Sequence, residues 1–352
     1  GLELGERAQP EVFNWLIDML QAEQPSMRIS LGDSVNMTGA VPFQREKADD
    51  LYDGWRDAYD RGNGDGYLIF GLGNHEGENL SAPFADYAMR ARLRTTEAPD
   101  TVANPPRYFS WRWGDVLFVM LDGSKRNLGL AEEAWLEQQL AQPATWKFVF
   151  HHYPFWNSDR GFNIADAVRL HSLFRDHGVQ VVFQAHDHWY ADFVKDGIHY
   201  TTTGGAGSPL RTADPAFNPI VEHHYLRVRQ EPTSVTVSAV RVQQDLNPDT
   251  LLDTYCVTLP GASTTDTDAD GTADVCDFDD DDDGIADRAD NCPLLANPAQ
   301  TDANGDGIGD DCAGDADGDA IMDANDNCPL IANVDQADLD GDGIGDVCDD
   351  DV

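Results

Sequence analysis

The chain has 352 residues, of which 64 are acidic and 23 basic, so its formal net charge is -41 and its length allows two or three compact units. Residues 261–352 hold 29 aspartates, no glutamate and one basic residue, Arg288, and therefore carry -28 of that charge. So negative a surface repels phosphates, which argues against nucleic acid or an anionic membrane as a partner. No apolar run approaches the roughly 18 residues that a membrane-spanning helix needs.

Short apolar strands alternate with helical patterns in residues 1–255, in the order expected of an α/β domain. An apolar face in residues 9–24 predicts the first helix. Strands are predicted at 27–31, 67–70, 116–121, 147–150 and 180–183, helices at 131–140 and 164–177, and hairpin strands at 225–229 and 234–242. This order predicts two sheets with helices outside them.

The tail, residues 256–352, differs in kind because its apolar residues are too sparse to form a core. All six cysteines lie in it, and an even number at regular spacing indicates disulfides and an oxidising compartment. Two interleaved series of cysteines recur every 36 residues, which marks an internal repeat. The cysteines are Cys256, Cys276, Cys292, Cys312, Cys328 and Cys348.

Four short polar motifs follow predicted strands, at the sheet edge where ligand sites assemble in α/β folds. A carboxylate, an amide oxygen and three imidazoles suit Zn, Fe or Mn better than calcium. Such a set predicts two-metal hydrolysis, in which a carboxylate bridges cations about 3.5 to 4 Å apart and a bridging water ionises near neutral pH. The motifs are Leu31-Gly32-Asp33-Ser34-Val35-Asn36, Gly73-Asn74-His75-Glu76, His151-His152-Tyr153-Pro154 and His186-Asp187-His188.

Each motif also has an ordinary structural explanation. A Gly-Asp pair after a strand is commonly a turn, Asn-His can cap a helix, and His186 and His188 alternate as strand residues do. The four together, each at a strand end, favour the metal site. Three other histidines are predicted to pack or to lie at the surface, and two just before a strand could line the site: His171, His177 and His199, and His223 and His224.

Aspartates in the tail recur with glycine at fixed offsets. In the first stretch, carboxylates stand at positions 1, 3, 5, 9 and 12, with Gly271 at position 6. Calcium takes six to eight oxygens, which this spacing supplies together with the position-7 carbonyl. Five loops follow this frame. Their predicted side-chain ligands are Asp266, Asp268, Asp270, Asp274 and Asp277; Asp279, Asp281, Asp283, Asp287 and Asp290; Asp302, Asn304, Asp306 and Asp310; Asp315, Asp317, Asp319, Asp323 and Asp326; and Asp338, Asp340, Asp342, Asp346 and Asp349.

The five loops are unequal. Asn304 replaces a carboxylate and Ala313 removes the last one in the third loop, and Ala320 replaces the glycine of the fourth, so we expect these two to bind calcium more weakly. A disordered acidic linker would also explain the composition, but five loops in register favour calcium sites. Helix-loop-helix modules are disfavoured, because their position 12 is normally Glu and loops beginning 13 residues apart leave no room for helices.

The segment Asn291-Cys292-Pro293, with Asn297-Pro298, Gln300 and the run from Asp302 to Cys312, resembles the thrombospondin type 3 repeat. The resemblance covers about residues 256–352. It implies an irregular chain wrapped around calcium, with cysteines 20 residues apart joined as Cys256–Cys276, Cys292–Cys312 and Cys328–Cys348. Each closure would supply roughly 3 kcal/mol and bound calcium the rest, so the tail should be largely unfolded without calcium.

The four polar motifs resemble the calcineurin-like metallophosphoesterase superfamily over roughly residues 1–245, and details such as Glu76 are closer to its purple acid phosphatase branch. The resemblance implies a four-layer αββα sandwich. It implies that Asp33 bridges two metals and that His188 belongs to one metal site. The other site would be completed by Asn74, His152 and His186. His75 would protonate the leaving oxygen or stabilise the transition state.

Three features depart from that family's pattern. The family opens with a strand ending in Asp-x-His, which supplies most of the first metal site, and we expect this strand just before Gly1. Asn36 stands where the purple enzymes have a metal-binding Tyr, so a ferric purple site is not expected. Ala185 replaces the usual glycine before the last histidine pair. A sixth calcium loop would start at Asp351, so we expect the repeats to continue as well.

The sequence thus predicts a metallophosphoesterase domain over residues 1–255 and calcium-binding repeats over residues 256–352. We expect a secreted or cell-surface phosphatase that acts on a small phosphorylated substrate, with the tail as a spacer or an attachment to a cell surface or matrix. A phosphodiesterase or nucleotidase of the same fold is the alternative for the substrate. An inactive, calcium-dependent adhesion or matrix protein is the alternative from another class.

Overall fold

The computed structural model describes residues 10–23, 25–32, 67–74, 107–156, 158, 161–206, 209–212, 214–244, 250–287, 289–305, 307–314, 321, 323, 326–331, 333–339 and 343–348. The chain forms two compact units, one made of Gly1–Arg227 and Val237–Thr254 and the other of Val228–Thr236 and Tyr255–Val352. The second unit includes a hairpin segment that the sequence analysis placed in the first domain. The predicted boundary after residue 255 stays a prediction.

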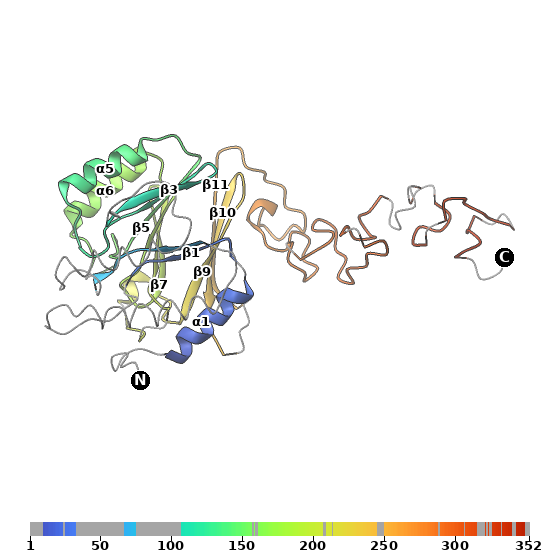
Figure 1. The fold of residues 1–352 in the computed structure, drawn as a ribbon, viewed down its shortest axis with the longest axis horizontal. Coiled ribbons are helices and arrows are strands. Elements are labelled where there is room, and N and C mark those ends of the chain that lie inside the picture. Colours follow the sequence, from blue (N-terminus) through green and yellow to red (C-terminus); the bar gives the residue numbers. More distant parts are fainter. Residues whose placement is uncertain are drawn as a thin grey trace. The chain divides into compact units, whose positions relative to one another are not determined.

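The elements in chain order are α1 (Pro10–Ala22), β1 (Met27–Ser30), β2 (Tyr67–Phe70), β3 (Phe109–Trp113), β4 (Val116–Met120), α5 (Leu130–Leu140), β5 (Trp146–His151), α6 (Ile164–Asp176), β6 (Val181–Gln184), β7 (Tyr190–Lys195), β8 (Ile198–Thr203), η1 (Pro215–Phe217), β9 (His224–Gln230), β10 (Ser234–Arg241), β11 (Leu251–Thr258) and η2 (Asp274–Cys276). Figure 1 shows their arrangement.

A six-stranded mixed sheet in the order β3-β4-β5-β6-β8-β7 forms the centre of the first unit. β4, β5, β6 and β8 are parallel, and β3 and β7 are antiparallel edge strands. Every residue of β5 and β6 is buried. Their mostly apolar sequences are typical of parallel strands that are covered on both faces. Because these strands are parallel, the residues that follow β4, β5 and β6 meet at one edge of the sheet.

Helices α5 and α6 cover one face of this sheet (Figure 1). Fully buried Leu136 on α5 and Leu170 and Phe174 on α6 share a core cluster with Val149 and Val182 of the strands. The first turn of α6 is stabilised by Asn163, whose side-chain oxygen accepts hydrogen bonds from two backbone amides of that turn. The opposite face is aromatic, with the rings of Phe118, Phe150 and Phe183 among those stacked across neighbouring strands.

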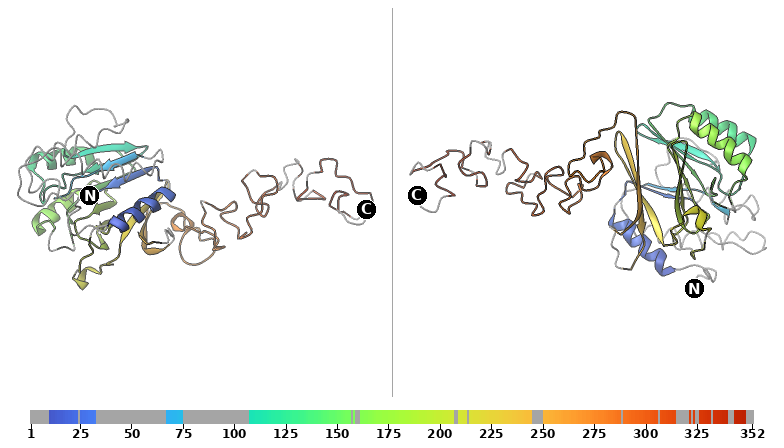
Figure 2. Two further views of the ribbon diagram at one scale, coloured as in Figure 1. Left: turned by 60° about the horizontal axis from the view of Figure 1, so that its bottom comes forward. Right: turned by 180° about the vertical axis from the view of Figure 1, so that it is seen from behind.

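The remaining strands form two smaller sheets. β1 and β2 pair in parallel, and β11, β10 and β9 form an antiparallel sheet in that order. Leu16 and Met19 of α1 pack against Tyr225 and Val240 of this second sheet. Figure 2 shows the resulting layers, with α5 and α6 on one outer side and α1 on the other. The predicted αββα sandwich is confirmed.

The tail is irregular, as expected. Its described residues contain one short 3₁₀ helix, η2, and three disulfides. Cys256, the first cysteine of the tail, lies on strand β11. The disulfide Cys256–Cys276 therefore joins this strand to the first repeat. No helix in the described ranges is long and apolar enough to cross a bilayer.

Leu170→Ala should lower the free energy of unfolding by about 2 to 5 kcal/mol, because it leaves a cavity under α6 where the leucine is fully buried. Val168 lies on the same helix and is 50% exposed, so Val168→Ala should change stability by about 0.5 kcal/mol or less. Urea unfolding of both variants measures the difference. Equal effects of the two substitutions would contradict the packing of α6 described above.

Candidate metal centre

The histidines of the site come from the carboxyl ends of adjacent strands. His152 follows β5, and His186 and His188 follow β6, while Asn74 follows β2. Of the pair His151-His152, only the second belongs to the site. His151 points into the core against Phe162, and burial lowers its pKa to about 4. The pleat of the strand thus directs adjacent histidines to opposite faces.

Three predicted ligands come together in the structure. Nε2 of His152 lies 3.0 Å from Oδ1 of Asn74 and 3.1 Å from Nδ1 of His186. The two imidazole rings are nearly perpendicular, with their centres 5.1 Å apart. Residues 74, 152 and 186 are far apart in the chain, so tertiary structure alone brings these atoms together.

The backbone determines which nitrogen of His152 carries a proton. Its Nδ1 lies 2.9 Å from the carbonyl oxygen of Leu31. A carbonyl can only accept a hydrogen bond, so Nδ1 must carry the proton and donate. In the neutral tautomer, Nε2 carries the lone pair and faces Oδ1 of Asn74 and Nδ1 of His186. Ligating histidines commonly donate their other nitrogen to a carbonyl in this way. The donor set therefore fits a metal ion.

His188 has the same arrangement at its Nδ1, which donates to the carbonyl of Pro209 at 2.7 Å and leaves the lone pair on Nε2. His186 adopts a left-handed backbone conformation with a φ of 63°, which is uncommon for a residue with a side chain and is often found at functional sites. The turn between β6 and β7 thus orients both histidines.

Close backbone approaches hold the loops of the site together. A Cβ atom on Gly123 would lie 2.0 Å from the carbonyl oxygen of Leu72 and 2.5 Å from Cβ of His152. Gly32 has a φ of +95°, and a Cβ there would lie 2.1 Å from the amide nitrogen of Gly73. Neither position can carry a side chain without displacing the loop that bears Asn74 or His152.

A buried carboxylate pair beside the site was not predicted from the sequence. Asp122 follows β4, and its backbone amide donates to Oε1 of Glu132 at 2.8 Å. Its own carboxylate accepts from the amide and hydroxyl of Ser124 and lies 3.9 Å from Arg107 and 3.7 Å from Lys125. Burial raises the pKa of Glu132 from 4.5 to about 7, and the charge of Asp122 adds to this. An aspartate directly after the predicted strand 116–121 was the signal that could have revealed the pair.

The other histidines have structural contacts. His171 is buried between the hydroxyl of Tyr200 and the carboxylate of Asp196, and His199 bonds Asp192 at 2.7 Å. Burial lowers the pKa of His224 to about 4. Nδ1 of His223 donates to the carbonyl of Gly205. His224 contacts the carbonyl of Glu222 and the hydroxyl of Thr203.

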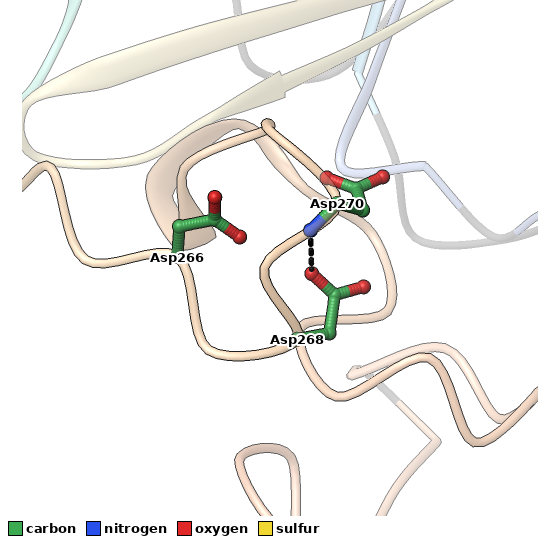
Figure 3. Close-up of side chains that lie close together, drawn as sticks. All are labelled: Asp266, Asp268 and Asp270. Carbon is green, nitrogen blue, oxygen red and sulfur yellow. Dashed lines mark hydrogen bonds between the residues drawn. The ribbon is translucent and has the colours of Figure 1, made fainter.

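Two groups of carboxylates in the second unit could hold a cation. Asp266, Asp268 and Asp270 form one group, and Asp279, Asp281 and Asp283 the other; each group has one oxygen per residue within 4.8 Å of the rest. Figure 3 shows the first group on its turn, where Oδ1 of Asp268 accepts from the amide of Asp270. These residues occupy positions 1, 3 and 5 of the first two predicted loops.

The described loops share one backbone geometry. The position-6 glycine is left-handed and donates its amide hydrogen to the position-1 aspartate, and the position-9 aspartate accepts from the position-2 amide. The first contact occurs in Gly271–Asp266, Gly284–Asp279, Gly307–Asp302 and Gly343–Asp338, and the second in Thr267–Asp274, Asp280–Asp287, Ala303–Asp310 and Leu339–Asp346. The aspartate at position 9 thus closes each of these four loops by a hydrogen bond to the backbone, independently of any ion.

Several carboxylate oxygens in these loops are buried without a hydrogen-bond partner in the described part of the chain. Four stand at the predicted ligand positions 1, 3 and 12, and one stands at position 2; they are Oδ1 of Asp266, Oδ2 of Asp281, Asp290 and Asp326, and Oδ1 of Asp280. Burying a charged oxygen without a partner is costly. Oxygen-rich cages of this kind match the preference of calcium. The donor set therefore fits calcium.

The repeats are held together by the same side-chain contacts 36 residues apart. Nε2 of Gln300 donates to Asp290, and Nε2 of Gln336 to Asp326, each at 2.7 Å. The buried half-cystines Cys292 and Cys328 pair with Cys312 and Cys348, as the repeat resemblance implies. Nine predicted ligands or catalytic residues lie outside the described residues: Asp33, His75, Asp306, Asp315, Asp317, Asp319, Asp340, Asp342 and Asp349.

Residues 6–190, just over half of the chain, match the family model of the calcineurin-like phosphoesterases. The chain belongs to this family. Residues 265–300 and 301–336 each match the thrombospondin type 3 repeat. A segment of 43 residues is 54% identical to mouse thrombospondin-2 and spans 12% of this chain and 4% of that protein. The chain thus corresponds to a small part of this curated relative.

Two solved structures have a similar fold. Purple acid phosphatase PPD1 from yellow lupin (Lupinus luteus) is 13% identical with a TM-score of 0.54, and the match covers 71% of this chain and 50% of that one. GAP50, the anchor in the inner membrane complex of Plasmodium, is 16% identical with a TM-score of 0.53, covering 73% and 86%. This phosphoesterase chain therefore spans half of the lupin enzyme and most of GAP50.

Glu132→Gln should remove a pH dependence of stability. The folded carboxyl keeps its proton up to about pH 7 and the unfolded one only to about 4.5, so the wild type loses stability as pH rises between these values. Glutamine keeps the oxygen that accepts from Asp122. The variant should match the wild type at pH 4 and exceed it by up to about 3 kcal/mol at pH 8.

Urea unfolding across this pH range measures the effect. Glu137→Gln, on the exposed side of α5, is the control and should follow the wild-type curve. Parallel curves for all three proteins would show that Glu132 is not buried as described.

Proposed function

We propose that this protein is a secreted, metal-dependent phosphoester hydrolase of the phosphatase type, with a dinuclear metal site and a calcium-binding tail. The proximity of Asn74, His152 and His186 carries the proposal, because Nε2 of His152 lies 3.0 Å from Oδ1 of Asn74 and 3.1 Å from Nδ1 of His186, and the three residues follow three different strands. Membership of the calcineurin-like phosphoesterase family supports the reaction class. The fold shared with the lupin phosphatase supports a monoester as substrate.

The residues would divide the work between two metals. Asn74, His152 and His186 would hold one, His188 would belong to the other, and Asp33, which lies outside the described residues, would be shared by both. When bound, such a pair polarises the phosphoryl oxygens and supplies a water that ionises near neutral pH. Fe, Zn and Mn suit this mixture of imidazole and oxygen ligands.

The protein's own part is to hold these ligands in place and to move a proton. The carbonyls of Leu31 and Pro209 fix the tautomers of His152 and His188, so that both rings present Nε2 without rearrangement. His75, one residue beyond Asn74, would donate a proton to the leaving oxygen as the ester bond breaks. A ligand set that is already oriented costs little reorganisation when the substrate binds.

His152→Ala should abolish hydrolysis of a generic aryl phosphate and lower the bound transition metal. Loss of an outer-shell partner alone costs about 10- to 100-fold, so removal of the ligand should cost at least about 100-fold. His177→Gln, a histidine at the end of α6 that lies away from this set, is the control and should keep both activity and metal. Phosphate release and elemental analysis of the full chain measure the two effects.

Full activity in His152→Ala would overturn the metal assignment. An inactive wild type that contains metal would favour a non-enzymatic role, since the same fold is found in GAP50, which is an anchor. A wild type that cleaves aryl phosphodiesters faster than monoesters would favour the phosphodiesterase alternative.

The tail would bind calcium through the loops and attach the enzyme to a cell surface or matrix, or separate it from one. Thrombospondin repeats and disulfides are typical of extracellular proteins. Calcium bound by the folded form alone would stabilise a segment that has almost no apolar core.

Calcium should protect the tail from proteolysis, and Asp281→Asn should raise the calcium concentration needed for protection, because it removes a carboxylate of the second group. Asp282→Asn alters the adjacent position 4, an exposed residue that is no predicted ligand, and should leave the titration unchanged. Limited digestion of the full chain at graded calcium concentrations measures both. Cleavage of the wild-type tail at the same rate with calcium and with chelator would refute the calcium loops.

A further inference from the structure

We propose that Arg126 binds a second phosphate group of the substrate, so that the enzyme prefers bisphosphorylated compounds over those with one phosphate. The inference rests on the proposed phosphoester hydrolysis and specifies its substrate class. It assigns a role to the loop of residues 122–129, which connects β4 to α5.

This loop lies directly beside the metal ligands. A Cβ on Gly123 would be only 2.5 Å from Cβ of His152. The base of the loop is fixed by the hydrogen bond from Asp122 to Glu132, and its far end by Leu128, which is buried in the core cluster. Arg126, between these anchors, is exposed. The loop therefore presents the arginine from a rigid support at the edge of the site.

An aromatic ring connects Arg126 to the site. The guanidinium carbon lies 5.5 Å from the centre of the Tyr153 ring, in the range of a cation–π contact. Tyr153 is fully buried, and its ring centre is 4.5 Å from that of His186. Because both distances are measured to the centre of the Tyr153 ring, the guanidinium carbon lies no more than 10.0 Å from the centre of the His186 ring. That span suits the far end of a small substrate whose reacting phosphate is at His186.

Arg126 makes no ion pair with a carboxylate in the described part of the chain. This is unusual here, because acidic residues outnumber basic ones 64 to 23, and most described arginines have a carboxylate within 4 Å. The paired arginines are Arg107, Arg169, Arg175, Arg227, Arg229 and Arg241. Arg126 can therefore bind an anion without first breaking an internal ion pair.

The surrounding charges favour an anion in the same place. Arg107 and Lys125 both lie within 4 Å of the carboxylate of Asp122, so two further basic side chains stand at the loop that carries Arg126. Basic groups in a strongly acidic protein concentrate the field for an incoming anion. A guanidinium also matches the geometry of phosphate through paired hydrogen bonds.

Arg126 is not among the predicted metal ligands, and we assign it the role of a positioning residue. It would hold the non-reacting phosphate and so orient the scissile ester toward the metal ligands. The effect of its removal should appear in the KM of a bisphosphate, and the kcat and KM of a monophosphate should stay unchanged.

The test compares fructose 1,6-bisphosphate with fructose 6-phosphate, using the full chain. The wild type should have about a tenfold lower KM for the bisphosphate, a size typical of a hydrogen-bonded charge pair. Arg126→Gln should abolish this preference, and Arg126→Lys should keep most of it because the charge remains. Arg169→Gln, an exposed arginine on α6, is the control and should behave as the wild type.

Calorimetric titration with both sugars of protein that has been depleted of transition metals and is kept in calcium provides a readout that needs no turnover. The bisphosphate should bind about tenfold more tightly than the monophosphate to the wild type, and equally to Arg126→Gln. Tighter binding that depends on Arg126, without hydrolysis by the metal-loaded protein, would support this inference and contradict the proposed function. Hydrolysis of both sugars with equal KM values in the wild type and Arg126→Gln would overturn the inference and leave the proposed function standing.

Discussion

The hydrogen bond from Nδ1 of His152 to the carbonyl of Leu31 is the contact on which the candidate metal centre depends. It joins the end of β5 to the end of β1, which belongs to another sheet, and sets the proton of the imidazole. Without it, the ring could present a proton instead of a lone pair to Asn74, and the three ligands would no longer fit a cation. The close approach of Gly123 to Leu72 and His152 supports the same junction.

Much of this centre could be predicted because the ends of strands can be recognised in the sequence. Asn74, His152 and His186 each follow an apolar run, and the parallel pairing of β5 and β6 brings the two histidines to one edge of their sheet. Asn74 follows β2 of another sheet and reaches His152 through the packing of the two sheets. The edge strands β3 and β7 and the neighbouring strand β8 were missed. Their alternation is interrupted by polar residues whose partners, such as Asp192 for His199, are set by pairing across the sheet. The contact of Glu132 with Asp122 joins a helix to a loop and has no periodic signal.

The calcium loops were easier to predict than the metal centre because almost all their contacts are local. Positions 1 to 12 of a loop determine its turn, its left-handed glycine and its facing carboxylates within one short segment. The position-9 aspartates show what could not be predicted from the sequence of these loops. Spacing alone groups them with the ligands, whereas the structure shows that they accept from the position-2 amide in every loop where both residues are described. The direction in which each side chain points depends on the three-dimensional turn, whereas the spacing of the aspartates can be seen in the sequence.

The three disulfides divide the tail into segments that would respond differently to tension. Most of the first, third and fifth loops lies inside the closed rings Cys256–Cys276, Cys292–Cys312 and Cys328–Cys348. A pulling force passes through each crosslink and bypasses the residues inside the ring. The second and fourth loops, residues 279–290 and 315–326, lie between rings and carry the full load. Under stretch, the tail would therefore release calcium from alternate loops first, and the force would reach strand β11 directly through Cys256.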